Sequence, residues 1–516
     1  MERWNLYYNK KLLLACISGG LLFLSFPKYG IGSVAWFALV PLLLALQKRS
    51  IKTALATGFI AGLVFNVGLI YWIALVVVNY GYLPLAVGLV AMLCLAAYLS
   101  IYVALFAGGL VYLREKGINQ VIAAPLLWTC LEYLKSHLLT GFPWENLAYS
   151  QYLNPHIIQI ADIAGTYGIT FVIVLINAVL CNLVDCVLSG SDGKRWQRPA
   201  LEFTSALLLL IAIFIYGELR IGEVRAQLKN APSLDVALVQ GNIDQSIKWN
   251  PQNQQETLTA YKSLSNLRPA IRSGLIVWPE TAMPFYFQDM DDRSRQVYQV
   301  AKETGNWLLF GSPSYIKEPG SASYLNSAFL LSPEGTISGR YDKVHLVPYG
   351  EYVPLRSLFP FIGKLVAGVG DFRAGEGYHP LTMHNHQLGV LICYEAILPE
   401  AGRIYKNKGA ELLVNITNDA WFGFSSAPYQ HLSMTVFRAV ENRLYVVRAA
   451  NTGISAIIDP AGNIVSRTAL FVATSLSGQV RFIDTRTFYM AYGDAFVYLC
   501  FISLTVILLN FRKRRK

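Results

Sequence analysis

The chain has 516 residues, of which 54% are hydrophobic and only 15% are charged. This composition is too apolar for an ordinary soluble enzyme and predicts an integral membrane protein. The net charge of +11 would fit a nucleic-acid partner. Many of the excess cations lie beside apolar runs, however, so membrane lipids with anionic headgroups are the simpler partner.

Long apolar runs fill the first part of the chain and its end. The clearest are residues 53–80 and 83–113, which contain no charged side chain. A helix needs roughly 20 residues to cross the apolar core of a bilayer, so each run is long enough. We expect a polytopic α-helical membrane bundle of about eight spans, at residues 11–27, 31–47, 53–80, 83–113, 118–138, 157–184, 201–217 and 488–511.

Basic residues predict the orientation of this bundle, because lysine and arginine accumulate in short loops on the cytoplasmic side. With eight spans, all basic clusters fall on one side, at residues 10–11, 48–52, 114–116, 194–198 and 512–515. Both termini are therefore expected in the cytoplasm. The expected domains are 1–217 for membrane helices one to seven, 218–485 for an extracytoplasmic domain, and 486–516 for the last helix and a basic tail.

Residues 218–485 contain short strand-like runs that alternate with turns and amphipathic helices, the pattern of an α/β domain. The expected strands are 235–239, 275–277, 307–310, 328–331, 388–392, 412–416, 445–449 and 455–458. The expected helices are 252–266, 294–304 and 431–442.

Two turns in this domain read almost alike, at residues 332–335 (SPEG) and 459–462 (DPAG), each with proline second and glycine fourth. The first turn places Lys343 beyond a hairpin rather than in a helix. Residues 355–371 are apolar, rich in glycine and broken by proline. Because this stretch follows Lys343 closely, we expect it to form a lid or a loop that dips into lipid.

Cys393 is the only cysteine within residues 218–485, whereas the other six lie in or beside predicted spans. Without a disulfide partner in its own domain, it is either an inert packing residue or a nucleophile. A free thiol has a pKa of roughly 8.5, so its attack on a carbonyl carbon needs a neighbouring base. Glu280 is the candidate base, provided that burial beside Trp278 raises its proton affinity.

Lys343 is the candidate cation for the oxyanion of a tetrahedral intermediate, and the backbone N–H of Tyr394 is the candidate second donor. Taken singly, these residues have ordinary interpretations. Glu280 alone would be an exposed loop carboxylate, and Lys343 alone a solvated hairpin lysine. Cys393 alone would be a buried structural thiol. Their joint occurrence in this order, with these flanking residues, favours catalysis.

Two nearby carboxylates and several histidines have more than one interpretation. Glu395 either positions a substrate amine or Lys343, or forms a surface ion pair. Glu351 either orients the three residues or satisfies a turn. Among His345, His384, His386 and His431, only His384 and His386 are close in sequence, and no third ligand lies near them. We therefore expect no metal site and no cofactor.

Glu280, Lys343 and Cys393, in this order and with these flanking residues, resemble the catalytic triad of the nitrilase superfamily. Together with the predicted spans, essentially the whole chain resembles the apolipoprotein N-acyltransferase family. The motifs that carry this resemblance are residues 141–146 (GFPWEN), 239–243 (VQGNI), 278–281 (WPET), 341–343 (YDK), 348–351 (PYGE), 393–395 (CYE) and 417–423 (TNDAWFG).

This resemblance implies a nitrilase-like αββα sandwich domain and an enzyme of bacterial lipoprotein maturation. The family moves an acyl chain from a phospholipid, through a thioester on the residue that matches Cys393, to the α-amino group of the diacylglyceryl-cysteine of an apolipoprotein. The resemblance also implies an inner-membrane protein whose catalytic domain is periplasmic. The implied roles are base for Glu280, oxyanion stabiliser for Lys343, support for Glu351, Tyr394 and Glu395, and lining of the lipid entry for Trp249.

Two other functions are compatible with parts of the sequence. A membrane-tethered nitrilase-type amidase acting on a soluble amide would use the same triad, but it gives no reason for a multi-span bundle or an apolar lid. A transporter or receptor would use the soluble domain only to bind ligand. Transport pathways usually need several ionisable residues in the membrane, and the spans hold few, chiefly Asp162 and Asp494.

Overall fold

The computed structural model describes residues 2–190, 193–266, 273–348, 350–352 and 372–513. The chain divides into two compact units. The first comprises Met1–Ala74, Leu85–Ile221 and Tyr492–Lys516, and the second comprises Leu75–Pro84 and Gly222–Ala491. The sequence analysis placed the corresponding boundaries at 217/218 and 485/486, and it assigned most of Leu75–Pro84 to membrane spans.

The second unit contains two six-stranded sheets. In spatial order, the first sheet consists of β12 (Thr474–Arg481), β1 (Ser233–Gln240), β2 (Leu275–Val277), β3 (Trp307–Glu318), β4 (Ser321–Leu331) and β5 (Ile337–Asp342). The second consists of β11 (Ile464–Arg467), β10 (Ala456–Ile458), β9 (Tyr445–Ala450), β8 (Leu412–Thr417), β7 (His386–Ile392) and β6 (Leu381–Met383).

Each sheet has a parallel centre. Strands β1, β2 and β3 are parallel to one another, and so are β7, β8 and β9. Strand β4 is antiparallel to both β3 and β5, so β5 runs in the same direction as β3. The carboxyl ends of β2 and β5 therefore lie at one edge of their sheet, which is where α/β proteins commonly build their sites.

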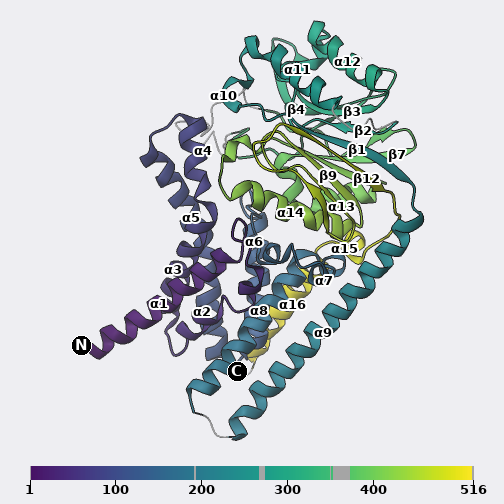
Figure 1. Cartoon of the computed structure of the whole chain (residues 1–516). Helices are drawn as coiled ribbons and strands as arrows, with labels where there is room; N and C mark the ends of the chain where they lie inside the picture. The colour runs from purple at the N-terminus through teal and green to yellow at the C-terminus, as the bar shows by residue number, and fades with distance from the viewer. Residues whose placement is uncertain (1, 191–192, 267–272, 349, 353–371, 514–516) are drawn as a thin grey trace. The chain divides into compact units, whose positions relative to one another are not determined.

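The two sheets stack face to face between two layers of helices (Figure 1). The first sheet is covered by α11 (Gln254–Ser265) and α12 (Asp292–Thr304), and the second by α13 (Pro399–Asn407) and α14 (Ala427–Asn442). The core under α11 and α12 is rich in aromatic side chains, including Tyr261, Trp278, Phe287 and Phe310. This arrangement is the αββα sandwich that the resemblance implied.

All eight strands predicted from the sequence are present, and the predicted turns join β4 to β5 and β10 to β11. In the first turn the Gly335 N–H donates to the Ser332 carbonyl at 2.9 Å, and in the second Gly462 donates to Asp459 at 2.9 Å. The strands that the sequence analysis missed are β5, β6, β11 and β12, the four edge strands. Edge strands are short or polar, so they lack the apolar pattern of central strands.

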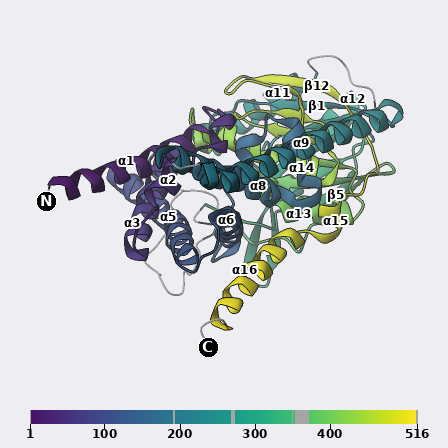
Figure 2. The ribbon, with the colours of Figure 1, turned by 90° about the horizontal axis from the view of Figure 1, so that it is seen from below.

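The first unit is made of helices, several of which lie beside one another (Figure 2). Its main elements are α1 (Glu2–Leu24), η1 (Gly32–Trp36), α2 (Val40–Ala45), α3 (Ile51–Ile70), α5 (Leu85–Glu115), α6 (Gln120–His137), α8 (Ala161–Leu188), α9 (Gly193–Asn230) and α16 (Ala495–Lys513). Shorter pieces are η2 (Leu147–Gln151) and α7 (Pro155–Ile158). Helix α9 begins in the first unit and ends in the second.

Within the described residues, four helices are long and apolar enough to cross a membrane: Ile51–Ile70, Leu85–Glu115, Ala161–Leu188 and Trp196–Asn230. They show a membrane bundle but do not confirm about eight spans. The expected spans 11–27, 31–47, 118–138 and 488–511 have no counterpart among the four. The last of these is divided between α15 (Phe488–Tyr492) and α16, with Gly493 in a left-handed conformation (φ +56°) between them.

The expected span 53–80 is also two helices rather than one. Helix α3 ends at Ile70, and α4 (Trp72–Gly81) follows after Tyr71. From Leu75 onward, α4 belongs to the second unit. Apolar composition did not reveal this division, because both helices are apolar and Tyr71 between them keeps helical dihedral angles (φ −53°, ψ −27°).

Helices α3 and α5 pack closely because glycines remove side chains where they meet. A Cβ atom on Gly58 would lie 2.5 Å from the Cβ atom of Ala107, and one on Gly62 would lie 3.0 Å from the Cα atom of Ser100. The spacing of the two glycines places them on one face of α3. This is the small-residue pattern by which membrane helices approach one another.

Asp162 is an ionisable residue buried in this unit, at the start of α8. It accepts a hydrogen bond from Arg220 Nε at 2.9 Å and one from the Tyr216 hydroxyl at 2.7 Å. Arg220 thus neutralises the charge of Asp162, which gives this aspartate a structural role.

We expect Arg220→Met to lower the thermal unfolding temperature in detergent, because a buried carboxylate without its cation costs about 3–5 kcal/mol. Adding Asp162→Asn should restore most of the loss, since asparagine still accepts from Tyr216. The control is Arg295→Met, which removes an exposed pair with Asp292 and should change little. Equal unfolding temperatures for the two arginine variants would contradict the interpretation.

Candidate active site

The three catalytic candidates from the sequence, Glu280, Lys343 and Cys393, all lie just after the ends of strands. Glu280 comes shortly after β2, Lys343 directly follows β5, and Cys393 directly follows β7. Lys343 Nζ lies 3.8 Å from Glu280 Oε1. The charges of both residues act on the Cys393 thiol. The fold therefore brings together residues that are far apart in the sequence.

The Glu280 carboxylate is buried and held by donors from both sheets. The side-chain amide of Asn326, on β4, donates to Oε1 at 2.8 Å. The backbone N–H of Asn418, just after β8, donates to Oε2 at 2.9 Å. Gly311 on β3 makes room for this residue, because a Cβ atom there would lie 2.8 Å from the Cα atom of Glu280.

Lys343 is only 1% exposed and pairs mainly with Glu351, at 3.0 Å from Oε1 and 2.8 Å from Oε2. The Asn326 amide also donates to Glu351 at 2.9 Å, so it bridges both carboxylates. Burial by itself lowers the pKa of Lys343, but the charges of Glu351 and then Glu280 outweigh it and hold the pKa above its ordinary value. Lys343 is therefore a fixed cation.

Glu395 is fully buried, which excludes the surface ion pair. It accepts hydrogen bonds from the Tyr341 hydroxyl at 2.8 Å and from the backbone N–H groups of Val344 at 2.8 Å, His345 at 3.0 Å and Ile392 at 2.8 Å. These bonds tie the segment that carries Lys343 to the turn that carries Cys393. Glu395 thus connects the two sheets at the site.

Cys393 is half-buried and has φ = +53°, a left-handed conformation that costs about 1–2 kcal/mol for a residue with a Cβ atom. Burial, and after it the negative charge of Glu280, raise the pKa of the thiol well above its ordinary value, although Lys343 opposes them. The thiol therefore stays protonated at neutral pH until a base removes its proton. The next residue, Tyr394, stacks on the His345 ring at 5.7 Å between centroids.

The sequence analysis missed a second buried lysine. Lys248 ends α10 (Gln245–Lys248), beside the half-buried Trp249. Its ammonium group is fully buried and donates to the Glu280 backbone carbonyl at 3.3 Å. Burial lowers the pKa of Lys248 to about 8. The sequence gave no signal of this burial, because lysine is a residue type that usually lies at the surface. Asn326 was missed as well, since it lies in the serine-containing first part of β4, before the predicted strand 328–331.

Other predicted features lie elsewhere or outside the described residues. The expected lid at 355–371 and Tyr349 fall among the residues that the structure does not describe. His384 Nε2 lies 2.8 Å from the Trp307 ring nitrogen, and His386 Nδ1 lies 3.0 Å from Glu411. The described residues contain no group of three metal-ligating side chains.

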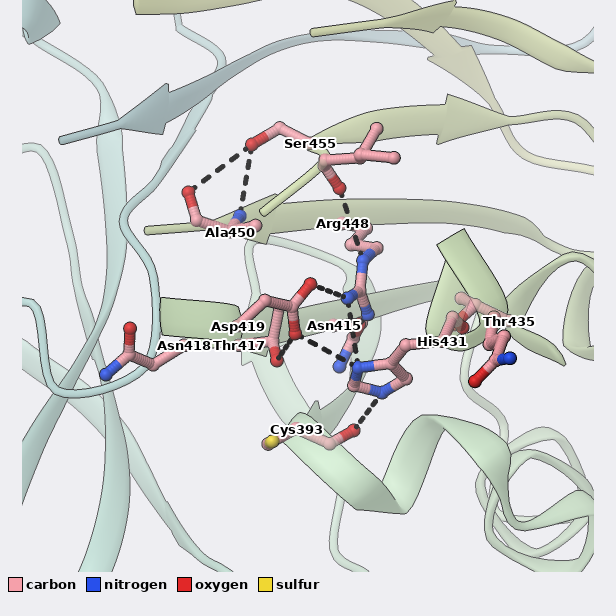
Figure 3. Close-up of polar contacts among 12 residues, drawn as sticks. Cys393, Asn415, Thr417, Asn418, Asp419, His431, Thr435, Arg448, Ala450 and Ser455 are labelled. Carbon is pink, nitrogen blue, oxygen red and sulfur yellow. Dashed lines mark hydrogen bonds and ion pairs between the residues drawn. The ribbon is translucent and has the colours of Figure 1, made fainter. Parts of the chain in front are cut away.

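A buried polar cluster lies beside Cys393 (Figure 3). Asp419, at the start of η6 (Asp419–Phe422), accepts from Arg448 Nη2 at 2.6 Å and from the Thr417 hydroxyl at 3.0 Å. Burial alone would raise the pKa of Asp419. The charge of Arg448 is the largest opposing cause, and with the hydrogen bonds to this carboxylate it lowers the pKa to about 2.

Helix α4 contacts the loop that contains Asp419. The Tyr80 hydroxyl donates to the Ala420 carbonyl at 2.7 Å, and its ring meets Trp421 edge-on at 4.9 Å between centroids. Asn418, in the same loop, is a donor to Glu280. A segment that reads as membrane helix in the sequence therefore supports the loop that orients this carboxylate.

Comparisons with known proteins agree with this organisation. Residues 18–179 match the model of the apolipoprotein N-acyltransferase N-terminal domain, and residues 235–487 match that of carbon-nitrogen hydrolase. A Geobacter metallireducens protein named apolipoprotein N-acyltransferase is 46% identical, over 98% of this chain and 96% of its own. A Pasteurella multocida protein of that name is 32% identical, over 98% and 97%. A solved carbon-nitrogen hydrolase from Helicobacter pylori G27 aligns with 48% of this chain and 88% of its own, at 17% identity and a TM-score of 0.38.

We expect Gly311→Ala to lower the catalytic rate by about 10-fold or more, because the added methyl group collides with the Glu280 backbone and small displacements of catalytic groups are costly. The control is Gly222→Ala, whose methyl group would meet no atom within 4 Å. The measurement is the initial rate at saturating substrate. A Gly311→Ala enzyme as fast as Gly222→Ala would show that Glu280 tolerates the shift.

Asp419 should make stability depend on acid pH. Its pKa is about 2 in the fold against an ordinary 3.8, so its ionisation stabilises the fold by about 2 kcal/mol above pH 4, and this is lost as the pH falls toward 2. Asp419→Asn lacks this contribution at every pH. The difference in unfolding temperature between wild type and Asp419→Asn should therefore narrow between pH 5 and pH 3, and a constant difference would contradict the assignment.

Proposed function

This chain belongs to the apolipoprotein N-acyltransferase family, and on that premise we propose that Glu280, Lys343 and Cys393 perform its acyl transfer. The enzyme is an acyltransferase that N-acylates lipoproteins. We propose a phospholipid as acyl donor and the α-amino group of a diacylglyceryl-cysteine as acceptor. The observation that carries the proposal is the meeting of a buried carboxylate, a fixed cation and a half-buried thiol at strand ends.

In the first stage, Glu280 takes the proton from Cys393 Sγ, and the thiolate attacks the ester carbonyl carbon of the phospholipid. The raised pKa of the thiol supports this step, because a thiol that stays protonated needs a base. The tetrahedral intermediate collapses to a thioester on Cys393. Glu280 returns the proton to the departing glycerol oxygen, which leaves as a lysophospholipid.

The negative oxygen of each tetrahedral intermediate needs donors that are already in place. Lys343 supports this role, because it is buried, ionised and held by Glu351 rather than by substrate. The backbone N–H of Tyr394 is the proposed second donor. Glu395 supports both groups through its bonds on either side of the site.

In the second stage, the lipoprotein amine attacks the thioester, Glu280 accepts its proton, and Cys393 leaves as a thiolate that is reprotonated. The order is ping-pong, because lysophospholipid departs before the acceptor reacts. Water competes for the thioester. The proposed lid at 355–371 and an aromatic lining that includes Trp249 would exclude water while admitting acyl chains.

We further propose that the membrane unit has eight spans, with both termini in the cytoplasm and the catalytic unit in the periplasm of a bacterial inner membrane. The basic clusters between apolar segments support this orientation. An amidase acting on a soluble amide is not favoured, because the match to the relatives covers 98% of the chain and includes its membrane unit.

We expect the purified enzyme to gain a hydroxylamine-labile acyl adduct on Cys393 when it is incubated with phospholipid alone. A diacylglyceryl-cysteine peptide should discharge this adduct. Intact-protein mass spectrometry measures both steps. If no adduct forms and a soluble amide is hydrolysed instead, the enzyme is an amidase.

Three substitutions test the roles separately. Cys393→Ser should abolish the thioester, and Glu280→Gln and Lys343→Met should each slow its formation by about 100-fold or more. Matched controls are Cys94→Ala, Glu256→Gln and Lys317→Met, which change the same residue types away from the site. Wild-type rates in any of the three site variants would refute its assigned role.

A further inference from the structure

The left-handed turn at Cys393 has a polar contact that the proposed reaction does not use. His431, on α14, places its Nε2 atom 3.1 Å from the backbone carbonyl oxygen of Cys393 (Figure 3). The His431 side chain is only 1% exposed. A carbonyl oxygen only accepts hydrogen bonds, so this contact requires that Nε2 carries the hydrogen.

The other ring nitrogen of His431 faces an ion pair. Nδ1 lies 3.1 Å from Arg448 Nη2 and 3.1 Å from Asp419 Oδ1. Burial, and after it the charge of Arg448, lower the pKa of His431, although Asp419 opposes them. This direction favours a neutral imidazole, in which Nε2 donates to the Cys393 carbonyl and Nδ1 accepts from Arg448. Asp419 Oδ1 then accepts its hydrogen bond from Thr417 rather than from the imidazole.

Arg448 is itself fixed from several sides. It donates to Asp419 at 2.6 Å, to the Asn415 side chain, and to the Ile454 carbonyl at 3.2 Å. All of these groups are buried in or beside β8 and β9. The tautomer and the orientation of His431 are thus set by the second sheet rather than by solvent.

The Cys393 carbonyl shares a planar peptide unit with the Tyr394 N–H. In a trans peptide these two groups point in opposite directions, and the unit rotates as one rigid body. A bond that holds the carbonyl toward His431 therefore also aims the N–H away from His431. That N–H is the proposed second donor to the oxyanion.

We propose that His431 is a positioning residue that orients the oxyanion-stabilising Tyr394 N–H by holding the Cys393 carbonyl, a role that rests on the proposed function of Cys393. The contact reaches the main-chain oxygen and not the sulfur, so His431 is neither a base nor a fourth member of the triad. Asp419 and Arg448 act through His431 by fixing its tautomer.

The test compares two replacements of His431. Glutamine carries an amide N–H at about the reach of Nε2, whereas methionine fills a similar volume without a donor. We expect His431→Met to slow thioester formation by about 10-fold or more with little change in the KM for phospholipid, and His431→Gln to remain within about 3-fold of wild type.

Alkylation of Cys393 by iodoacetamide distinguishes this role from general damage. Displacement of iodide forms no oxyanion, so both variants should alkylate at close to the wild-type rate. A merely structural role predicts that acylation, alkylation and unfolding temperature fall together in both variants. That result, or acylation by His431→Met at the wild-type rate, would overturn the proposal.

A replacement variant and a wild-type control ensure that the experiment tests the positioning role even if His431→Met does not fold. If His431→Met does not fold, His431→Asn replaces it, because its amide is polar but too short to reach the Cys393 carbonyl. Thioester formation by the wild-type enzyme distinguishes failure of the proposed function from failure of the positioning role of His431. If wild type forms no thioester, the proposed function fails, whereas a wild-type thioester with an unimpaired His431 variant defeats only the positioning role.

Discussion

The site is organised around the ion pairs that the buried ammonium group of Lys343 forms. Removing a charged group from water costs several kcal/mol, and only well-placed opposite charges and hydrogen bonds offset that cost. Glu351 and Glu280 supply the charges, and the Asn326 amide holds both carboxylates in place. The positions of β4, β5 and the turn after β7 are all constrained by this arrangement. A cation held by protein carboxylates is oriented before any substrate arrives.

Hydrogen bonds also fix the backbone around Cys393, the proposed nucleophile. Cys393 adopts a strained backbone conformation, and the surrounding structure determines it from both sides, through Glu395 at the preceding N–H and His431 at the following carbonyl. Strain of this kind persists only where neighbouring contacts impose it. The backbone of the proposed nucleophile therefore depends on side chains outside the proposed triad. Glu395 lies in the turn that follows β7, and His431 lies on α14.

The two parts of the chain match different family models, the acyltransferase N-terminal domain in the first part and carbon-nitrogen hydrolase in residues 235–487. Either water or an amine can attack a thioester on cysteine. Whether hydrolysis or N-acylation follows therefore depends on which of the two can reach the thioester. The match to the N-terminal family model covers residues 18–179, far from Cys393 in the sequence. Tyr80 belongs to the residues that match this model but lies in the second unit, where its hydroxyl donates to the loop beside Glu280.

The sequence predicted the central strands, both turns and the three residues of the proposed triad, and it missed the four edge strands. Central strands are buried on both faces and so appear as apolar runs, whereas edge strands such as β11 and β12 are half-exposed and polar. Hydropathy likewise merged α3 with α4, because both helices are apolar and Tyr71 between them keeps helical dihedral angles.

The sequence by itself determined which chemistry is proposed for this protein, because the proposed nucleophile, base and cation are residue types in a recognisable order. Only the tertiary structure decided the pKa shifts of Lys343 and Cys393 and the orientations of all three side chains. Whether Glu395 is a surface charge or a buried support, and whether Glu351 only satisfies a turn or pairs with Lys343, depends on which strands meet. This is a property of the fold as a whole. The same holds for Lys248 and His431, whose roles come from burial and from partners that are distant along the chain. Local sequence carries no record of such long-range contacts.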